Sequence, residues 1–151
     1  MEHRKSSHNV HHLQIHLVWI TKYRYKVLTG DIQLRCRDIL RQVSNSLDIK
    51  ILKGVVSKDH IHLHVSYPPK LSVSDMVKRL KGRSSRMLLQ EFPELQLRYW
   101  GNHFWAIGYG CRSVSKVISL DRSDIVIHIL FYQQLPDVYV FLPLIPENLV
   151  Q

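Results

Sequence analysis

The spacing of hydrophobic and polar residues changes several times along the chain, and each change predicts a new element of secondary structure. In residues 12–23 apolar side chains at first alternate with their neighbours at the period of a β-strand. From Asp31 to Leu47 apolar residues recur at steps of three and four, which predicts an amphipathic helix. Residues 50–57 are rich in aliphatic side chains, and we predict a second strand there.

The segment KDHIHLHVSYPPK, residues 58–70, alternates histidine with aliphatic residues and predicts a third strand. The histidines share one strand face and the aliphatic residues share the other. The histidines are His60, His62 and His64, and the aliphatic residues are Ile61, Leu63 and Val65. Pro68-Pro69 ends this strand, because proline supplies no N–H group to a strand ladder. The polar turn Lys58-Asp59 predicts a hairpin with the preceding strand.

A second helix is predicted from Ser72 to about Glu91, since Ser72 and Asp75 have the spacing of a capping box. Residues 97–111 are aromatic and punctuated by glycine, and we expect a final strand there with its approach loop. The order strand, helix, strand, strand, helix, strand predicts an α+β fold, the ferredoxin-like (RRM-like) split βαβ sandwich. In that fold two helices cover one face of an antiparallel sheet, so the histidines should point to the other face.

The composition and charge indicate a globular protein with a polyanionic partner. Of the 151 residues, 45% are hydrophobic and 22% are charged, which is typical of one domain with a real core. Lysine and arginine outnumber acidic residues 21 to 12, a formal charge of +9. This imbalance favours nucleic acid as partner, ahead of an anionic membrane surface. A basic enzyme without such a partner is the alternative.

The chain shows no sequence signal for a membrane or for an oxidising compartment. No apolar run approaches the roughly 20 residues that span a bilayer, and the N-terminus lacks the apolar core of a signal peptide. Two cysteines, Cys36 and Cys111, are too few for a disulfide framework and fit a reducing compartment. We therefore expect a cytoplasmic protein with no membrane partner.

The histidine strand is a candidate metal site. Two imidazoles on one strand face, about 7 Å apart at their Cα atoms, can converge on one divalent ion. Asp59 could orient one of these imidazoles through a hydrogen bond. The alternative is that the histidines are half-buried polar residues of an ordinary strand.

Two basic stretches are candidate nucleic-acid contacts. Residues 77–87 place a glycine and two serines among several cations, and residues 22–26 interleave cations with tyrosines. The candidate DNA-binding residues are Lys22, Arg24, Lys26, Lys81, Arg83 and Arg86. Nearby aromatic residues could stack on unpaired bases. The alternatives are a solvated helix surface for the cations and a core position for Trp100, Phe104 and Trp105.

Four stretches resemble, in order, motifs of the single-tyrosine HUH transposases encoded by the smallest bacterial insertion sequences. They are HLVWITKYRYKVLTG, KDHIHLHVSYPPK, KRLKGRSSRMLLQEFPEL and YWGNHFWAIGYGC, within about residues 8–112. The resemblance implies a ferredoxin-like homodimer that recognises imperfect DNA hairpins and cuts and rejoins single-stranded DNA without ATP. It also implies that His60 and His62 are ligands of a divalent metal, Mg²⁺ or Mn²⁺, with His64 as a strand neighbour or at most an accessory ligand.

The C-terminal segment departs from that family's pattern. In the family a helical tyrosine attacks the scissile phosphate, leaving a 5′-phosphotyrosine link and a free 3′-OH, and a glutamine one turn later helps to bind the metal. The corresponding position lies near Ile125, whereas the nearest tyrosine is Tyr132, with Pro136 where the glutamine would stand. We therefore predict one domain over residues 1–151, with a core at 8–112, an atypical segment at 113–151 and Tyr132 as candidate nucleophile.

Two other functions remain open from the sequence. Histidine-triad nucleotide hydrolases have a His-φ-His-φ-His-φ-φ motif that HIHLHVS nearly meets, although Ser66 breaks its last apolar position and the glycine-rich phosphate loop is absent. A non-catalytic nucleic-acid-binding module is the expected result if the nucleophilic tyrosine is lost.

Overall fold

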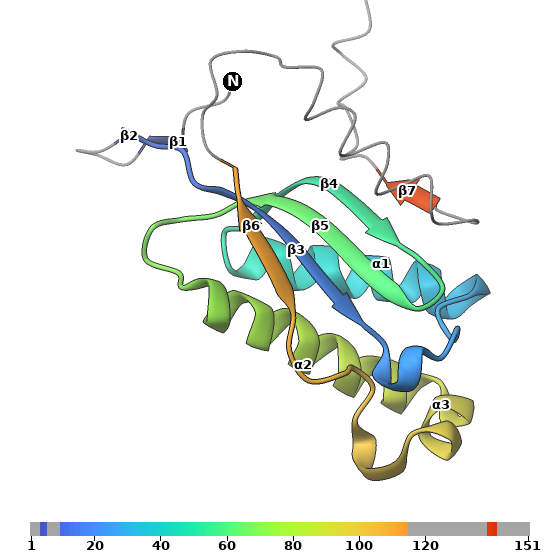
Figure 1. Ribbon diagram of the computed structural model, residues 1–151. Coiled ribbons are helices and arrows are strands. Elements are labelled where there is room, and N and C mark those ends of the chain that lie inside the picture. Colours follow the sequence, from blue (N-terminus) through green and yellow to red (C-terminus); the bar gives the residue numbers. More distant parts are fainter. Residues whose placement is uncertain (1–3, 6–9, 115–138, 142–151) are drawn as a thin grey trace, which may run out of the picture.

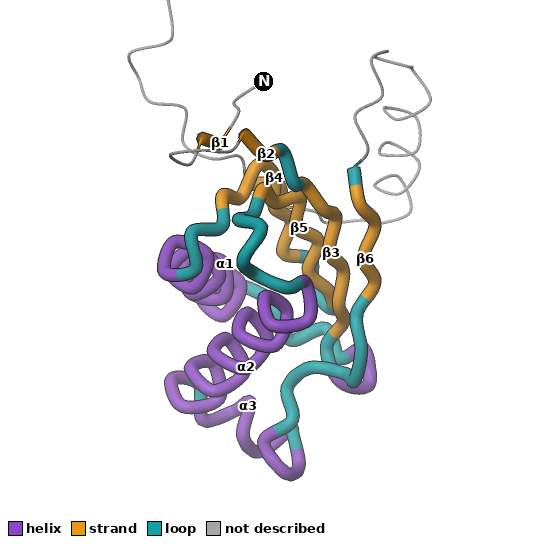
Figure 2. Tube along the Cα trace, turned by 90° about the vertical axis from the view of Figure 1, so that its left-hand side faces the viewer, coloured by secondary structure: helices purple, strands orange, loops and turns teal. Residues whose placement is uncertain are grey.

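The computed structural model describes residues 4–5, 10–114 and 139–141, which form a sheet layer and a helix layer (Figure 1). Figure 2 shows the two layers edge on, with the long helices against one face of the sheet. The main elements are β3 (Gln14–Ile20), α1 (Gly30–Ser46), β4 (Lys50–Val56), β5 (His60–Ser66), α2 (Val73–Glu91), α3 (Pro93–Arg98), β6 (Gly110–Ser113) and β7 (Tyr139–Phe141). The short elements are β1 (Arg4–Lys5), β2 (Val10–His11) and the 3₁₀ turns η1 (Lys22–Arg24) and η2 (Trp100–Asn102).

The sheet has the strand order β6-β3-β5-β4-β7, and all its neighbouring strands are antiparallel. Its first four strands alternate with α1 and α2 in the ferredoxin-like order, with β3 and β5 in the centre. The predicted α+β fold class and the β4–β5 hairpin are therefore confirmed. The pairing of β7 with β4 adds a fifth strand that the sequence did not predict.

The core lies between the sheet and the two long helices, because each strand turns its aliphatic residues to that side. Members from the sheet are Ile15, Leu17, Trp19, Ile61, Leu63 and Val65, and members from α1 and α2 include Cys36, Ile39, Leu40, Met76, Leu80 and Leu88. Alternation then sends the intervening polar residues of β3 and β5 to the opposite face. We call this surface the histidine face, and its polar residues are Gln14, His16, His60, His62 and His64.

The two long helices begin and pack as the sequence pattern predicts. At the start of α2 the Asp75 N–H donates to Ser72 Oγ at 3.1 Å, so Ser72 is the N-cap that the sequence predicted, and its hydroxyl donates to Asp75 Oδ2 at 2.9 Å. Arg35 of α1 and Glu91 of α2 join the helices through a bidentate ion pair, with N···O distances of 2.6 and 2.8 Å.

The expected final strand with its approach loop is present, but most of residues 97–111 form the approach and only the last two belong to β6. Pro93 starts the short helix α3, and Gly101 and Asn102 adopt left-handed backbone angles with φ of 70° and 58°. These angles are incompatible with an extended strand. The aromatic side chains of Phe104 and Trp105 are instead buried in the core.

The candidate nucleophile Tyr132 and the position near Ile125 lie outside the described residues. Among the described residues, no helix is both long and apolar enough to cross a bilayer.

Candidate metal and DNA-binding site

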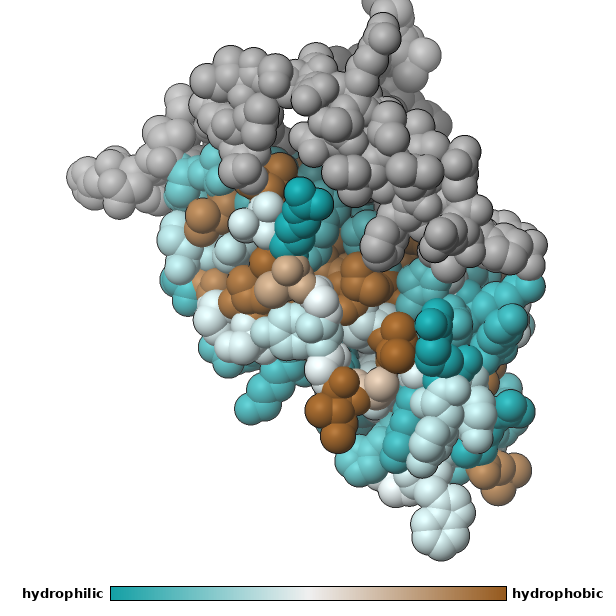
Figure 3. Space-filling view, viewed as in Figure 1, coloured by the Kyte–Doolittle hydropathy of each residue, from teal (hydrophilic) through white to brown (hydrophobic). Residues whose placement is uncertain are grey.

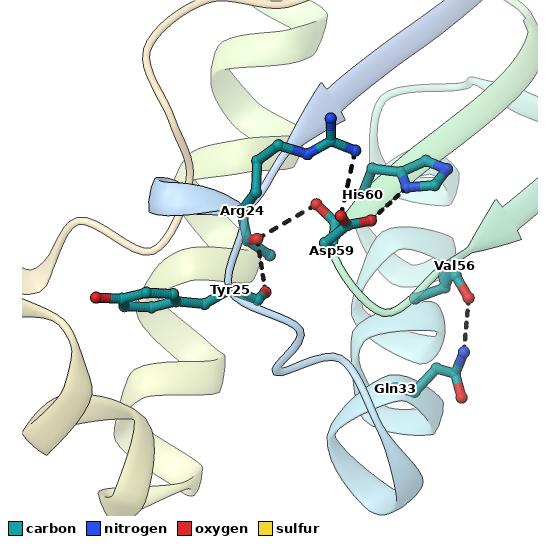
Figure 4. Close-up of polar contacts among 7 residues, drawn as sticks. Arg24, Tyr25, Gln33, Val56, Asp59 and His60 are labelled. Atoms are coloured by element: carbon teal, nitrogen blue, oxygen red, sulfur yellow. Dashed lines mark hydrogen bonds and ion pairs between the residues drawn. The ribbon is translucent and has the colours of Figure 1, made fainter. Parts of the chain in front are cut away.

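His60 stands at the start of β5 and is held by the turn residue before it. Its Nδ1 lies 2.7 Å from Asp59 Oδ1, and Asp59 Oδ2 lies 3.2 Å from Arg24 Nη2. The Asp59 carboxylate therefore lies between the His60 ring and the Arg24 guanidinium (Figure 4). A carboxylate only accepts hydrogen bonds, which assigns the Nδ1 proton to His60. The Nε2 atom of a neutral His60 therefore carries the lone pair that a metal ligand requires.

Asp59 is suited to this task because it remains ionised. Burial by itself would raise the pKa of its carboxyl group, but hydrogen bonds and charge interactions with His60 and Arg24 outweigh burial. The net result is a pKa below the usual aspartate value. The orienting contact that the sequence suggested between Asp59 and an imidazole is thus present.

His62 contacts a histidine that sequence reasoning did not select. Its Nε2 lies 3.2 Å from Nδ1 of His16, which comes from the neighbouring strand β3. The ring of His16 also stacks on His64, with centroids 4.3 Å apart. His16 was visible in the sequence only as a polar residue at the strand period, and pairing of β3 with β5 is what brings it here.

The histidine face differs in one respect from the accessible surface that the sequence suggested. His60 and His62 lie on the side away from the helices, as expected, but only 5% and 9% of their surfaces are exposed. Among the described residues, no cluster of three or more His, Cys, Asp or Glu side chains is arranged to hold an ion. Two imidazoles still fit a divalent ion that completes its shell with water or phosphate oxygen.

The first cationic stretch lies beside this site. Thr21 fixes it, because the Thr21 N–H donates to the Asp59 carbonyl at 2.9 Å and its hydroxyl donates to the Tyr25 carbonyl at 2.8 Å. Lys22 is half-buried, whereas Arg24 and Lys26 are exposed. The turn therefore places Arg24 against Asp59, with Lys22 and Lys26 two residues away on either side of it.

The second cationic stretch lies on the helix layer, on the other side of the molecule from the histidine face. A groove of about 630 Å³ runs between α1 and α2. We call it the helix groove, and its lining residues are Gln42, Val43, Ser46, Leu47, Asp75, Lys78, Arg79, Gly82, Arg83 and Arg86. It contains two predicted DNA-binding residues, Arg83 and Arg86, and two further cations that were not selected.

Lys81 has a different environment from the other cations of α2. Its ammonium group donates to the carbonyl oxygens of Ala106 and Gly108 at 2.7 and 2.8 Å. Burial lowers the pKa of Lys81. This side chain ties α2 to the loop before β6 and does not line the helix groove, in contrast to the exposed position that the sequence suggested.

Ser84 also differs from its expected place near a phosphate backbone. It is fully buried, and its hydroxyl accepts a hydrogen bond of 3.0 Å from Trp105 Nε1 while it donates to the Leu80 carbonyl at 2.6 Å. Together with Lys81, Ser84 connects α2 to the approach to β6. Of the candidate stacking residues, Phe104 and Trp105 are core residues, whereas Trp100 is 89% exposed.

Comparison with known proteins identifies relatives for most of the chain. The sequence profile described as "Transposase IS200 like" matches residues 9–125. The ISDra2 transposase TnpA of Deinococcus radiodurans is 34% identical over 116 residues, which cover 77% of this chain and 83% of that protein. The transposase for insertion sequence element IS200 of Salmonella typhimurium is 34% identical over 110 residues, which cover 73% of this chain and 72% of that protein.

Two solved structures are also similar. A crystal structure of a transposase from Deinococcus radiodurans R1 superposes with a TM-score of 0.70 at 30% identity, covering 89% of this chain and 99% of that one. A REP-associated tyrosine transposase bound to a REP hairpin gives a TM-score of 0.55 at 15% identity, covering 83% of this chain and 68% of that one, and shares the fold. On the profile match and the sequence identities, this chain belongs to the IS200-like transposase family.

Proposed function

We propose that this transposase binds hairpin DNA ends and cleaves and rejoins single-stranded DNA through a tyrosine–phosphate link, with weak cleavage because its tyrosine motif is displaced. The observation that supports this most directly is the 2.7 Å contact between Asp59 and His60, since His60 lies two residues before His62 on β5. An oriented imidazole beside a second one could supply two ligands to a divalent ion, and the family resemblance indicates Mg²⁺ or Mn²⁺ as that ion.

In the proposed reaction the phenolic oxygen of a tyrosine forms a bond to the scissile phosphorus. The bond from phosphorus to the 3′-oxygen breaks, the proton lost by the phenol ends on that oxygen, and the DNA keeps a 5′-phosphotyrosine link and a free 3′-OH. A bound divalent ion supplies positive charge that polarises the phosphate. His60 and His62 would hold it, Asp59 keeps His60 oriented, and the cations of residues 22–26 are placed to bind the DNA backbone.

DNA recognition on this proposal uses two surfaces. The helix groove carries Arg83 and Arg86, whose positive charges suit the phosphates of a paired stem. The turn with Lys22, Arg24 and Lys26 lies beside His60 and suits the adjacent single strand. That a related tyrosine transposase has been solved with a REP hairpin supports a hairpin as the ligand.

Tyr132 is the candidate nucleophile, and we expect it to attack poorly. It follows the family's expected position by about seven residues, which is roughly 10 Å along a helix axis, and in-line attack tolerates far less. Pro136 would also interrupt a helix through this segment. Incubation with a labelled single-stranded hairpin oligonucleotide and Mn²⁺ should therefore give little covalent protein–DNA adduct on a denaturing gel.

The matched variants in that assay are Tyr132→Phe and Tyr23→Phe, which each remove one hydroxyl group. Abundant adduct that disappears only in Tyr132→Phe would refute weak cleavage and make Tyr132 the nucleophile. A complete lack of adduct together with tight hairpin binding would favour the second candidate function, a non-catalytic DNA-binding module. The observation favouring that module is that Tyr132 lies beyond residues 9–125, which the family profile matches.

We further propose that the protein is a homodimer, since two copies could hold two DNA ends together. The edge strand β6 supports this, because its residues are exposed and no described strand pairs with its outer side. Ile107 and Tyr109, just before β6, are exposed apolar residues, and apolar surface is visible on this side of the molecule in Figure 3. Sedimentation at micromolar concentration should show a dimer, and a monomer at every concentration tested would contradict the proposal.

A further inference from the structure

We propose that His16 is a positioning residue for His62, in the way that Asp59 positions His60. The inference rests on the proposed role of His60 and His62 as metal ligands. Its starting observation is the 3.2 Å contact between His16 Nδ1 and His62 Nε2 across strands β3 and β5. A neutral His62 keeps a lone pair for a metal ion, on Nδ1, only if its Nε2–H donates to Nδ1 of His16, so the contact restricts the tautomer of His62 as well as its ring angle.

His16 can orient a neighbour because its own ring is held in place. It lies opposite His64 in the strand register, and the two rings stack with an interplanar angle of 19°. His64 is in turn anchored by a 3.0 Å contact between its Nε2 and Gln14 Oε1. Gln14, His64, His16 and His62 thus form a continuous chain of contacts on the histidine face.

The two proposed ligands would then each have a fixed partner from a different part of the fold. Asp59 in the turn before β5 contacts His60 at 2.7 Å, and His16 in β3 contacts His62 at 3.2 Å. A ligand whose ring is held before the ion arrives loses less rotational freedom on binding. Removal of such a partner typically lowers metal affinity by about 10–100-fold.

The test compares two substitutions at His16 that are similar in shape but differ in polarity. Asparagine places an amide atom near the position of the imidazole Nδ1, whereas leucine fills similar space without a polar atom. We expect His16→Leu to lower the affinity for Mn²⁺, measured by calorimetry without DNA, by about 10-fold or more, and His16→Asn to recover most of this loss. His103→Leu, which removes an exposed imidazole, should leave the affinity unchanged.

A spectroscopic readout separates positioning from a general effect on packing. Long-range ¹H–¹⁵N spectra of the metal-free protein report which ring nitrogen of each histidine is protonated. The wild-type protein and His16→Asn should show one tautomer of His62, and His16→Leu should show a mixture. Thermal unfolding of both variants, measured alongside, shows that each is folded at the temperature of the binding and spectroscopic measurements.

Three results would overturn the inference. The first is wild-type Mn²⁺ affinity in His16→Leu while His62→Ala loses the ion. The second is an equal loss of affinity in His16→Leu and His16→Asn, and the third is a mixed tautomer of His62 in the wild-type protein. If His62→Ala itself leaves Mn²⁺ affinity unchanged, the proposed ligand role of His62 is wrong, and the role of His16 is wrong with it.

Discussion

Replacing His60 or His62 with alanine should lower the affinity for Mn²⁺ by about 100-fold or more, because each change removes a ligand rather than a ligand's partner. Any strand cleavage of a hairpin oligonucleotide should disappear in the same variants. Asp59→Asn should have a smaller effect, about 10-fold on affinity, because the amide oxygen can still accept the His60 N–H but lacks the negative charge. Calorimetry with Mn²⁺ and with Mg²⁺ measures these values.

The matched control is His103→Ala, which removes an imidazole that is exposed and far along the chain from β5. Each variant should also bind hairpin DNA, since the helix groove lies on the other layer of the fold. Unchanged metal affinity in both His60→Ala and His62→Ala would show that the divalent ion, if one binds, uses other residues. Loss of DNA binding as well as metal binding would point to misfolding instead.

Reversing the charge of Arg83 and Arg86 together should weaken hairpin DNA binding by about 100-fold or more at low salt. Both side chains line the helix groove, and each phosphate contact that is lost should reduce the slope of log affinity against log salt by about one unit. The double variant Arg83→Glu with Arg86→Glu should therefore have a slope about two units smaller. Fluorescence anisotropy over a range of salt concentrations measures both quantities.

The control for total charge is Lys50→Glu with Lys70→Glu, which changes the net charge equally at two exposed lysines outside the groove. Lys81→Met should also leave the salt slope nearly unchanged, because the Lys81 ammonium already donates to two carbonyl groups. A groove variant with wild-type salt dependence would refute the assignment of Arg83 and Arg86. A large slope change in Lys81→Met would show that this lysine leaves its carbonyl partners to meet DNA.

The sequence alone determined which side of each central element faces the core. In β5 aliphatic residues such as Leu63 alternate with histidines. A strand places alternate side chains on opposite faces, so the aliphatic residues face the core and the histidines face away from it. The N-cap residue Ser72 likewise fixed the start of α2, because a cap depends on residues close together in the chain. Local spacing was enough for both.

Residues 97–109 could not be read in this way. Their aromatic content favours a strand, but Gly101 and Asn102 take left-handed backbone angles, and the segment forms a short helix, a turn and a loop. The segment is held by residues of α2 that are distant in the sequence. Lys81 donates to its carbonyl groups, and Ser84 accepts a hydrogen bond from Trp105. Such contacts leave no periodic pattern in the sequence. The sequence therefore could not show that Lys81 and Ser84 bind this segment rather than face DNA.

The composition of the candidate site shows the same division between sequence and tertiary structure. The sequence determined that His60 and His62 share a strand face and that Asp59 stands beside them, because these residues are adjacent in the chain. Only the antiparallel register of β3 with β5 decided that His16 meets His62, and only helix packing decided that Arg83 and Arg86 lie in a groove on the other layer. The physical reason is that side-chain period is set by the local backbone, whereas a contact between strands or helices depends on how the whole core packs.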